Sequence, residues 1–362
     1  WQNDPFRRAE FTDYLRGKFG TIDKLNAAWG TTYADFASVP ILPTNGLPRE
    51  ADMTPLRYEM ARFNMLEFSE YHKFMAEVVH ATRPGTPAHA KVMCVPSNRQ
   101  NLAWGCDPEQ FAWMGDLNGN DCWNMFSGFG DQYAANWMAQ NVYYDLQRSM
   151  REVPVINTED HIIVDREQRL IPPQHTDFAL WQGAIHGRGA SMIWVWERTY
   201  DRTHDFEGSI LHRPENVVAV GRVGLDLQRL APEVVKLQRA RTPVAILYSM
   251  TAQLWSDTAY GTMMKAYEAL NACGVPVRFV SEQQAAAGRL KAFRAVIAPA
   301  VKHAPDSLAA AIAAYCLGGG KLWVIGEEPV CGRDEYNRPR ALHLPETAVV
   351  QFPGDLSARE LW

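Results

Sequence analysis

Val153-Pro-Val-Ile-Asn-Thr-Glu-Asp160 decides the fold, because it is a short apolar run that ends in a carboxylate, Glu159. Strand-like and helix-like patterns alternate around it, so it predicts a strand of a parallel sheet with Glu159 at the rim where such folds do their chemistry. A carboxylate beside flat indole rings suits a sugar-cleaving pocket, since the acid can attack the anomeric carbon while a ring stacks on the sugar. The alternative is an ordinary strand-end residue that faces solvent.

The sequence around this run predicts four consecutive strand–helix units. The predicted strands cover residues 88–95, 120–126, 153–158 and 191–196, and the predicted helices cover 107–114, 133–150, 175–187 and 214–230. Such alternation implies a parallel sheet. Four units are too few to close an eight-stranded barrel, so either the sheet is open or four preceding units are missing. Ahead of them, helices are expected within 5–29 and over 55–81, and the apolar stripe of the second one is expected in the core, namely Met60, Phe63, Met65, Leu66, Phe68, Phe74 and Met75.

A second α/β module begins near residue 241, after a linker. Its predicted strands, 244–248, 275–280, 295–299 and 321–325, alternate with helices at 262–273 and 305–317. This order is typical of a doubly wound module of flavodoxin-like character. The module also looks amidotransferase-like, but Cys316 lies in a helical pattern without the strand-to-helix elbow of a nucleophile. We therefore divide the chain into a first domain at 1–235, a second at 241–350, and a further segment or tail at 351–362.

The composition is that of an ordinary soluble globular protein, with 47% hydrophobic and 21% charged residues and a net charge of −5 over 362 residues. It contains no lysine- or arginine-rich face and no apolar run of 18 residues, which argues against nucleic-acid and membrane partners. Six cysteines without a Cys-x-x-Cys pair favour free thiols and a cytoplasmic location over a periplasmic or secreted one. The histidines lack metal-ligand spacing, so we expect neither a metal nor an organic cofactor. The first residue is Trp1, which indicates a processed or truncated product.

The predicted strand ends supply candidate partners for Glu159. Glycoside hydrolysis usually uses two carboxylates. The other strand ends offer residues 97–98, Asn124 and residues 197–198, and none of these gives a second carboxylate that we assign across from Glu159. Trp123, Trp194 and Trp196 cluster at strand ends and are candidate sugar platforms, since leucine or valine would serve equally well for burial alone.

One N-terminal segment carries a family resemblance. Residues 11–31, Phe-Thr-Asp-Tyr-Leu-Arg-Gly-Lys-Phe-Gly-Thr-Ile-Asp-Lys-Leu-Asn-Ala-Ala-Trp-Gly-Thr, resemble a segment of the glycoside hydrolase family 42 β-galactosidases that follows the fourth barrel strand. The likeness continues at 107–116, 122–126, 157–159, 186–190, 274–277 and 334–338. It implies the C-terminal half, strands five to eight, of a (β/α)8 TIM barrel, followed by a trimerisation-like domain. Strands one to four, with the acid/base glutamate, would then precede this chain.

The resemblance also implies roles for single residues. Glu159 would be the nucleophile on strand seven, with Asn124, Asn157 and the strand-end tryptophans contacting the sugar. The last strand reads Trp194-Val-Trp-Glu197 where the family has aromatic-Arg-Trp-Arg. The family's Glu-then-His pair near the galactose site appears in reverse order, as His204 and Glu207. These departures leave another β-linked sugar or an oligosaccharide open as the substrate.

From these residues and this resemblance we predict a retaining, β-galactosidase-like glycoside hydrolase. It would act on a β-galactoside or oligosaccharide without a cofactor and would assemble as a homo-oligomer, with a trimer implied by its second domain. The alternative is a non-catalytic carbohydrate-binding or assembly protein derived from such an enzyme, which gains ground if this chain is the complete molecule. A third interpretation, an amidotransferase centred on the second domain, lacks an activated cysteine with a histidine partner.

Overall fold

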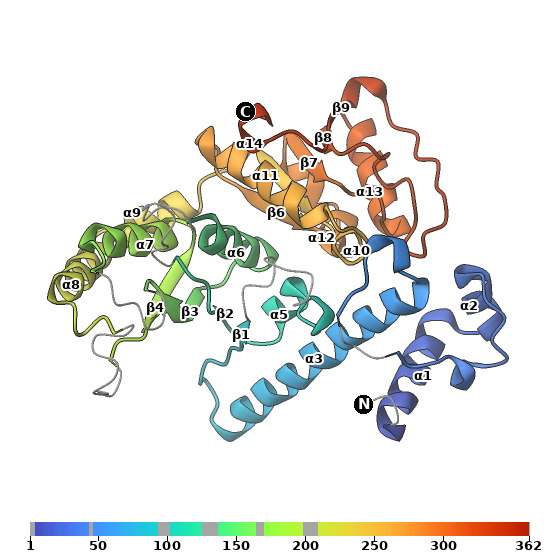
Figure 1. Ribbon diagram of the computed structural model, residues 1–362, viewed down its shortest axis with the longest axis horizontal. Helices are drawn as coiled ribbons and strands as arrows, with labels where there is room; N and C mark the ends of the chain where they lie inside the picture. The colour runs from blue at the N-terminus through green and yellow to red at the C-terminus, as the bar shows by residue number, and fades with distance from the viewer. Residues whose placement is uncertain are drawn as a thin grey trace.

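The computed structural model describes residues 4–42, 46–92, 102–124, 137–163, 170–197 and 209–361. Over these residues the chain builds two separate parallel sheets with flanking helices (Figure 1). It begins with helices α1 (Pro5–Phe19), α2 (Ile22–Trp29) and α3 (Pro55–Thr82). The side chains of Asp4 and Thr54 accept backbone hydrogen bonds at the starts of α1 and α3, and Gly20 follows α1 with a positive φ of 74°.

The first sheet has four parallel strands in the order β1-β2-β3-β4. They are β1 (Lys91–Val92), β2 (Asn118–Asn120), β3 (Val155–His161) and β4 (Arg188–Trp194), separated by α5 (Pro108–Trp113), α6 (Trp137–Met150) and α7 (Pro173–Ile185). Two helices, α8 (Pro214–Arg229) and α9 (Ala231–Gln238), follow β4. The predicted α/β class with parallel sheets is confirmed.

The position of β2 differs from the prediction. The strand lies at 118–120, whereas the sequence predicted 120–126, of which residues 125 and 126 lie outside the described part of the chain. Its residues are Asn-Gly-Asn, and they are held by buried polar contacts with α6 and not by an apolar face. The Asn120 amide donates to Gln147 Oε1 at 2.7 Å, and the Asn118 amide donates to the Gln147 carbonyl at 3.3 Å. A strand stabilised in this way carries no hydrophobic alternation that a sequence pattern could detect.

The second sheet has five parallel strands in the order β6-β5-β7-β8-β9, the flavodoxin-type order. They are β5 (Val244–Tyr248), β6 (Arg278–Ser281), β7 (Ala295–Pro299), β8 (Lys321–Ile325) and β9 (Val349–Phe352). The helices are α10 (Met250–Trp255), α11 (Ala259–Ala272), α12 (Glu282–Ala286), α13 (Asp306–Leu317) and α14 (Ala358–Leu361). The predicted domain limit at residue 350 falls within β9, so the sheet extends past it.

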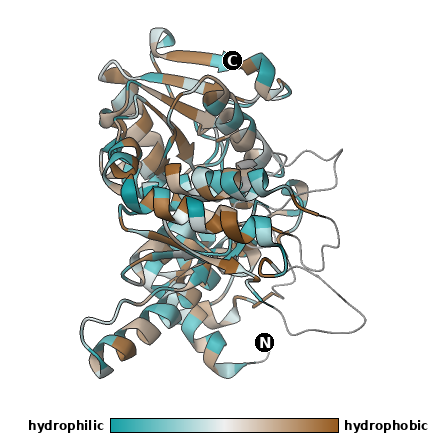
Figure 2. Cartoon of the chain, turned by 90° about the vertical axis from the view of Figure 1, so that its left-hand side faces the viewer, coloured by the Kyte–Doolittle hydropathy of each residue, from teal (hydrophilic) through white to brown (hydrophobic). Residues whose placement is uncertain are grey.

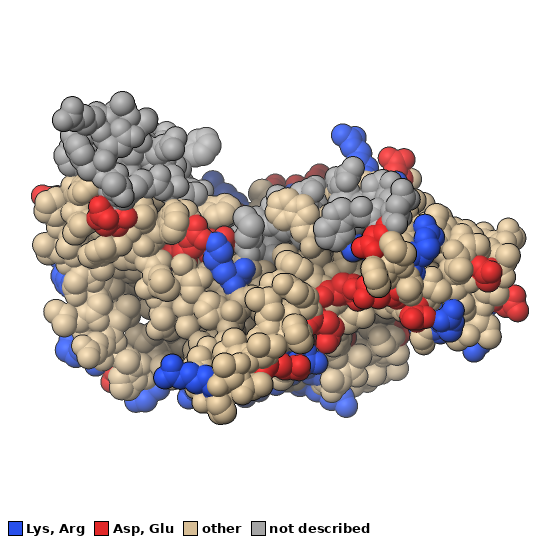
Figure 3. All heavy atoms as spheres, turned by 90° about the horizontal axis from the view of Figure 1, so that it is seen from below, with Lys and Arg blue, Asp and Glu red and all other residues tan. Residues whose placement is uncertain are grey.

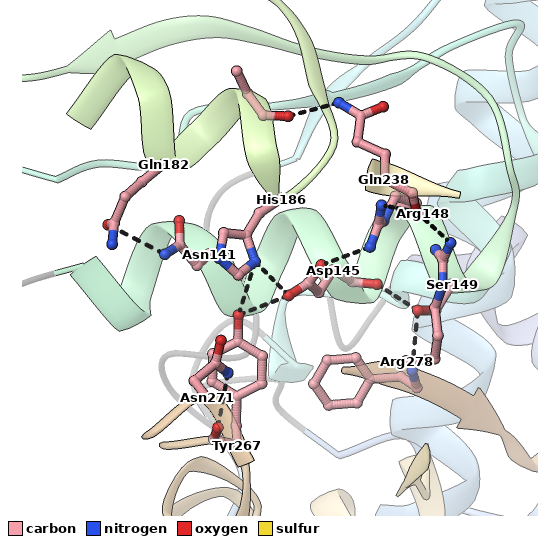
Figure 4. Close-up of polar contacts among 12 residues, drawn as sticks. Asn141, Asp145, Arg148, Ser149, Gln182, His186, Gln238, Tyr267, Asn271 and Arg278 are labelled. Carbon is pink, nitrogen blue, oxygen red and sulfur yellow. Dashed lines mark hydrogen bonds and ion pairs between the residues drawn. The ribbon is translucent and has the colours of Figure 1, made fainter. Parts of the chain in front are cut away.

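Helix α6 connects the first sheet to the second module through polar side chains (Figure 4). His186 Nδ1 lies 2.7 Å from the buried carboxylate of Asp145 on α6, and the Tyr267 hydroxyl on α11 donates to the same oxygen at 2.8 Å. The Ser149 hydroxyl accepts the backbone N–H of Phe279 on β6 at 3.0 Å. Because α6 directly precedes β3, these contacts fix the helix behind the strand that carries Glu159.

Glu59 on α3 forms another buried junction. Its carboxylate is fully buried, accepts hydrogen bonds of 2.6 Å from the hydroxyls of Tyr14 and Tyr336, and pairs with Lys18. Burial, and then the charge of Glu59, raise the pKa of both tyrosines far above the ordinary value. Tyr336 lies between β8 and β9, so Glu59 ties α1 and α3 to the second module.

Part of the surface near the first sheet is apolar. On α3, Phe74 is 59% exposed, although its helical spacing predicted a core position, and on α8 Leu225 is 69% exposed. Met192 on β4 is 62% exposed, and β4 is an edge strand of the sheet. Figure 2 looks onto the side that carries α8, and hydrophobic positions lie there among hydrophilic ones. Apolar side chains on an edge strand are unusual for a surface that faces only water.

On the face seen in Figure 3, acidic and basic side chains are interspersed among the residues drawn in colour. Within the described part of the chain, no helix is both long and apolar enough to cross a membrane.

Glu109 on α5 gives a pH-dependent prediction about stability. Burial raises the pKa of this carboxyl to about 7. The hydroxyl of Ser281 on β6, which donates to the carboxyl, opposes the rise, and the charges of Asp107 and Glu282 add to it. A raised pKa in the folded state stabilises the fold below the unfolded-state pKa, near 4.5, and this stabilisation is lost as the pH rises through 7.

We therefore expect Glu109→Gln to raise the free energy of unfolding by about 2 kcal/mol at pH 8.5 and to leave it nearly unchanged at pH 4. Urea unfolding at both pH values measures the difference. Glu152→Gln is the matched control, because the Glu152 side chain is 64% exposed. Equal effects of Glu109→Gln at the two pH values would contradict the prediction.

Candidate functional site

Glu159 lies within β3, between β2 and β4. The pairing of β3 with β4 shifts register between Asn157 and Asp160, so both of these side chains turn toward α6 although they are three residues apart. Asn157 donates to the Tyr144 hydroxyl at 2.7 Å, and Asp160 accepts from the Gln140 amide at 3.3 Å. The Glu159 side chain therefore points to the opposite face of the sheet, where it is 20% exposed.

Among the described residues, Lys91 and His161 lie against the carboxylate of Glu159. Lys91 on β1 forms an ion pair with its Oε2 atom, and His161 Nε2 lies 3.5 Å from its Oε1 atom. Lys91 Nζ also lies 3.8 Å from an oxygen of Asp121, the residue directly after β2. The hydrogen bond with Glu159 raises the pKa of Lys91, against the opposing effect of partial burial. Both oxygens of Glu159 thus have a nitrogen neighbour.

Two of the predicted tryptophans, Trp194 and Trp123, lie next to His161, the neighbour of this carboxylate. The ring centroids of Trp194 and His161 are 5.9 Å apart, and Trp194 is 37% exposed. Trp123 is partly buried against the core, and its backbone pairs with that of His161. Trp196 lies two residues beyond the end of β4 and is 42% exposed. His161 therefore links Glu159 to two of the three predicted platforms.

Both predicted asparagines contact helices that flank the sheet, Asn157 through its side chain and Asn124 through its backbone carbonyl. Asn157 is fully buried; its amide donates to the Cys122 carbonyl at 2.7 Å, and its Oδ1 atom accepts the backbone N–H of Glu159 at 3.1 Å. Asn124 is also fully buried, and its carbonyl lies 2.8 Å from Nε2 of His175. This geometry favours a supporting role for Asn157 in fixing the Glu159 backbone, and direct sugar contact by either residue stays a prediction.

His204 and Glu207 lie outside the described residues. Sequence reasoning missed Lys91, Asp121 and His161. A signal existed for Asp121, a carboxylate next to a strand end, but the predicted strand ran past it to residue 126. Among the residues that the structure describes, no group of three or more metal-ligating side chains gathers at one point.

Glu159 lies on a parallel strand with an ammonium and an imidazole beside it and an indole beside the imidazole, so this is an α/β protein with a polar site on the sheet face opposite α6. Residues 4–235 match the family model Glyco_hydro_42, described as Beta-galactosidase. The chain belongs to glycoside hydrolase family 42.

The chain is also similar to curated proteins and to solved structures. The chain is 24% identical to a β-galactosidase from Arthrobacter sp over 87% of its length and 46% of the relative, and 26% identical to one from Haloferax lucentense over 91% and 50%. It resembles the crystal structure of an apo exo-carrageenase of the same family from Bacteroides ovatus, with a TM-score of 0.80, 24% identity and coverage of 96% and 49%.

A β-galactosidase from Bacillus circulans sp. alkalophilus has a TM-score of 0.72 at 16% identity, with coverage of 92% and 50%. The likenesses to these solved structures establish the fold. The chain spans about half the length of the curated relatives it matches.

Proposed function

We propose that this chain is the part of a retaining β-glycosidase that carries the nucleophile, Glu159. The observation that supports the proposal most is the placement of Glu159. It lies on the sheet face opposite α6, and His161 beside it contacts the exposed indole ring of Trp194. Family membership points to β-linked sugars, and the β-galactosidase relatives point to β-galactosides among them.

The reaction would follow the two-step scheme of retaining enzymes. In the first step a Glu159 oxygen forms a bond to the anomeric carbon while the bond to the leaving oxygen breaks and an acid protonates that oxygen. In the second step water, deprotonated by the same group, attacks the anomeric carbon, and Glu159 leaves as a carboxylate. The exposed indole of Trp194 would stack on the sugar ring.

We propose that the acid/base glutamate lies on a further barrel half, outside this sequence, that packs on the first sheet. The exposed Met192 on edge strand β4 and the exposed Leu225 on α8 support this, because closing a barrel buries such side chains and pairs the edge strand. The second module would then serve in homo-oligomer assembly, which light scattering on the full-length protein measures.

Azide rescue of a Glu159→Gly variant tests the proposal. We expect the full-length variant to be inactive on a 2,4-dinitrophenyl β-galactoside and to regain turnover when azide fills the vacated space and attacks the anomeric carbon. The product should be the α-glycosyl azide, identified by NMR. Activity of Glu159→Gly without azide would overturn the assignment, and an inactive unchanged full-length protein on all aryl β-glycosides would favour the non-catalytic alternative.

A further inference from the structure

Lys91 reaches Glu159 across the intervening strand. On the sheet, Lys91 is paired with Gly119 of β2, and Gly119 is paired with Ile156 of β3. A Cβ atom at Gly119 would collide with the Ala90 carbonyl and with His89. Position 119 of β2, between β1 and β3, therefore accepts only glycine. Because Gly119 has no side chain, the aliphatic part of Lys91 can cross β2 and place Nζ on the Glu159 carboxylate.

The Lys91 ammonium lies between two carboxylates. Besides its contact with Glu159 Oε2, Nζ is 3.8 Å from Asp121 Oδ2, and the Asp121 side chain is only 10% exposed. The hydrogen bond to Glu159 raises the pKa of Lys91, partial burial opposes the rise, and the charges of Glu159 and Asp121 add to it. Lys91 therefore stays charged at neutral pH, and one of its two counter-charges takes no part in the proposed reaction.

We propose that Lys91 is a positioning residue that holds the Glu159 carboxylate and favours its return as an anion, and that Asp121 keeps Lys91 in place throughout. This inference rests on the proposed function. When the Glu159 oxygen bonds to the anomeric carbon, the carboxylate becomes a neutral ester and its attraction for Lys91 falls. Asp121 then remains as the partner of the ammonium, so the cation does not have to move.

In the second step water attacks the anomeric carbon, the carbon–oxygen bond of the ester breaks, and its electron pair returns to Glu159. A cation already fixed beside the other carboxylate oxygen stabilises the charge that develops there. Lys91 should therefore speed the hydrolysis of the ester more than its formation. A lysine that only supported the fold would change both steps alike.

The contact itself is tested by competitive acetylation of lysines, read by mass spectrometry, which needs no catalytic turnover. Lys73 is the matched reference, because it is exposed to a similar degree, 49% against 40%, and pairs with Glu70 at 3.6 Å on the surface. We expect Lys91 to react about tenfold more slowly than Lys73, because the hydrogen bond to a charged group must break first. Glu159→Gln should remove most of this protection. Equal rates in the unchanged protein would overturn the inference.

The role is tested by steady-state kinetics of the full-length protein on the 2,4-dinitrophenyl β-glycoside that it turns over fastest. This leaving group departs without protonation, so hydrolysis of the ester limits kcat. We expect Lys91→Met to lower kcat about tenfold and KM by a similar factor, with kcat/KM nearly unchanged. Lys91→Arg should recover most of kcat, and Lys73→Met should behave as the unchanged protein.

The possible outcomes distinguish the role of Lys91 from the assignment of Glu159 as the nucleophile. Parallel losses of kcat and kcat/KM in Lys91→Met, or no loss at all, would overturn the role of Lys91 while leaving Glu159 as the nucleophile. If the unchanged full-length protein turned over no aryl β-glycoside, the proposed function and the role resting on it would both fail, and the protection of Lys91 would still report the ion pair.

Discussion

Glu159→Gln is expected to lower kcat of the full-length protein on a nitrophenyl β-glycoside by about 10⁴-fold or more, the scale seen when a covalent nucleophile is removed. The amide has nearly the same size as the carboxylate, but it neither attacks the anomeric carbon nor leaves from it as an anion. Asn157 accepts the backbone N–H of Glu159, which the substitution leaves unchanged, so Asn157 should keep its place in the variant. The measurement is initial rate against substrate concentration for both proteins.

Two controls keep this result interpretable. The melting temperature of Glu159→Gln should stay close to that of the unchanged protein, so that lost turnover is not lost folding. Glu152→Gln removes a carboxylate from the same region but from an exposed side chain, and it should retain full activity. Glu159→Gln activity within about tenfold of the unchanged protein would refute the nucleophile assignment.

The second sheet shows which strands a sequence can locate. Strands β5, β7 and β8 lie at the predicted residues, because each is a short, largely apolar run in the module's core. Strand β9 escaped prediction since Val-Val-Gln-Phe at 349–352 is an edge strand with a half-exposed, mixed pattern.

The candidate site was predictable only in part, for a related reason. Glu159 and Trp194 ended apolar runs and could be recognised. The contact of Lys91 with Glu159 could be recognised only from the strand register, which places Gly119 between Lys91 and β3. Asp121 follows a strand whose buried asparagines bond to α6, and no local pattern reveals such a partner.

Helix α3 shows a different limit. Its apolar spacing predicted burial along the whole helix, and Met60, Phe63 and Met65 are buried as expected. Phe74 and Met75 carry the same signal but are 59% and 47% exposed. Helical periodicity identifies an apolar face that packs against another surface. It does not tell whether that surface belongs to the same polypeptide segment.

Asp160→Ala is expected to lower the free energy of unfolding by about 4 kcal/mol, because it leaves the charge of Arg188 buried without a partner. Asp160 is fully buried, pairs with Arg188 and accepts from the Ser191 hydroxyl at 2.5 Å. Arg188 also donates to the Leu180 carbonyl at 2.7 Å, and a Cβ atom at Gly183 would overlap its guanidinium group at 2.6 Å. Helix α7 thus packs closely against the guanidinium group of Arg188 at the start of β4.

Urea unfolding of three variants separates the free-energy cost of an unpaired buried charge from the cost of shortening a side chain. The double variant Asp160→Ala with Arg188→Met should be more stable than Asp160→Ala alone, because no ion then remains buried without its partner. Arg222→Ala removes the surface pair with Asp177, where the arginine is 59% exposed, and should leave stability nearly unchanged. If the double variant were no more stable than the single one, the cost would come from lost packing. Asp160 adjoins Glu159, so a destabilised pair should also disorder the end of β3 and lower activity before the protein unfolds.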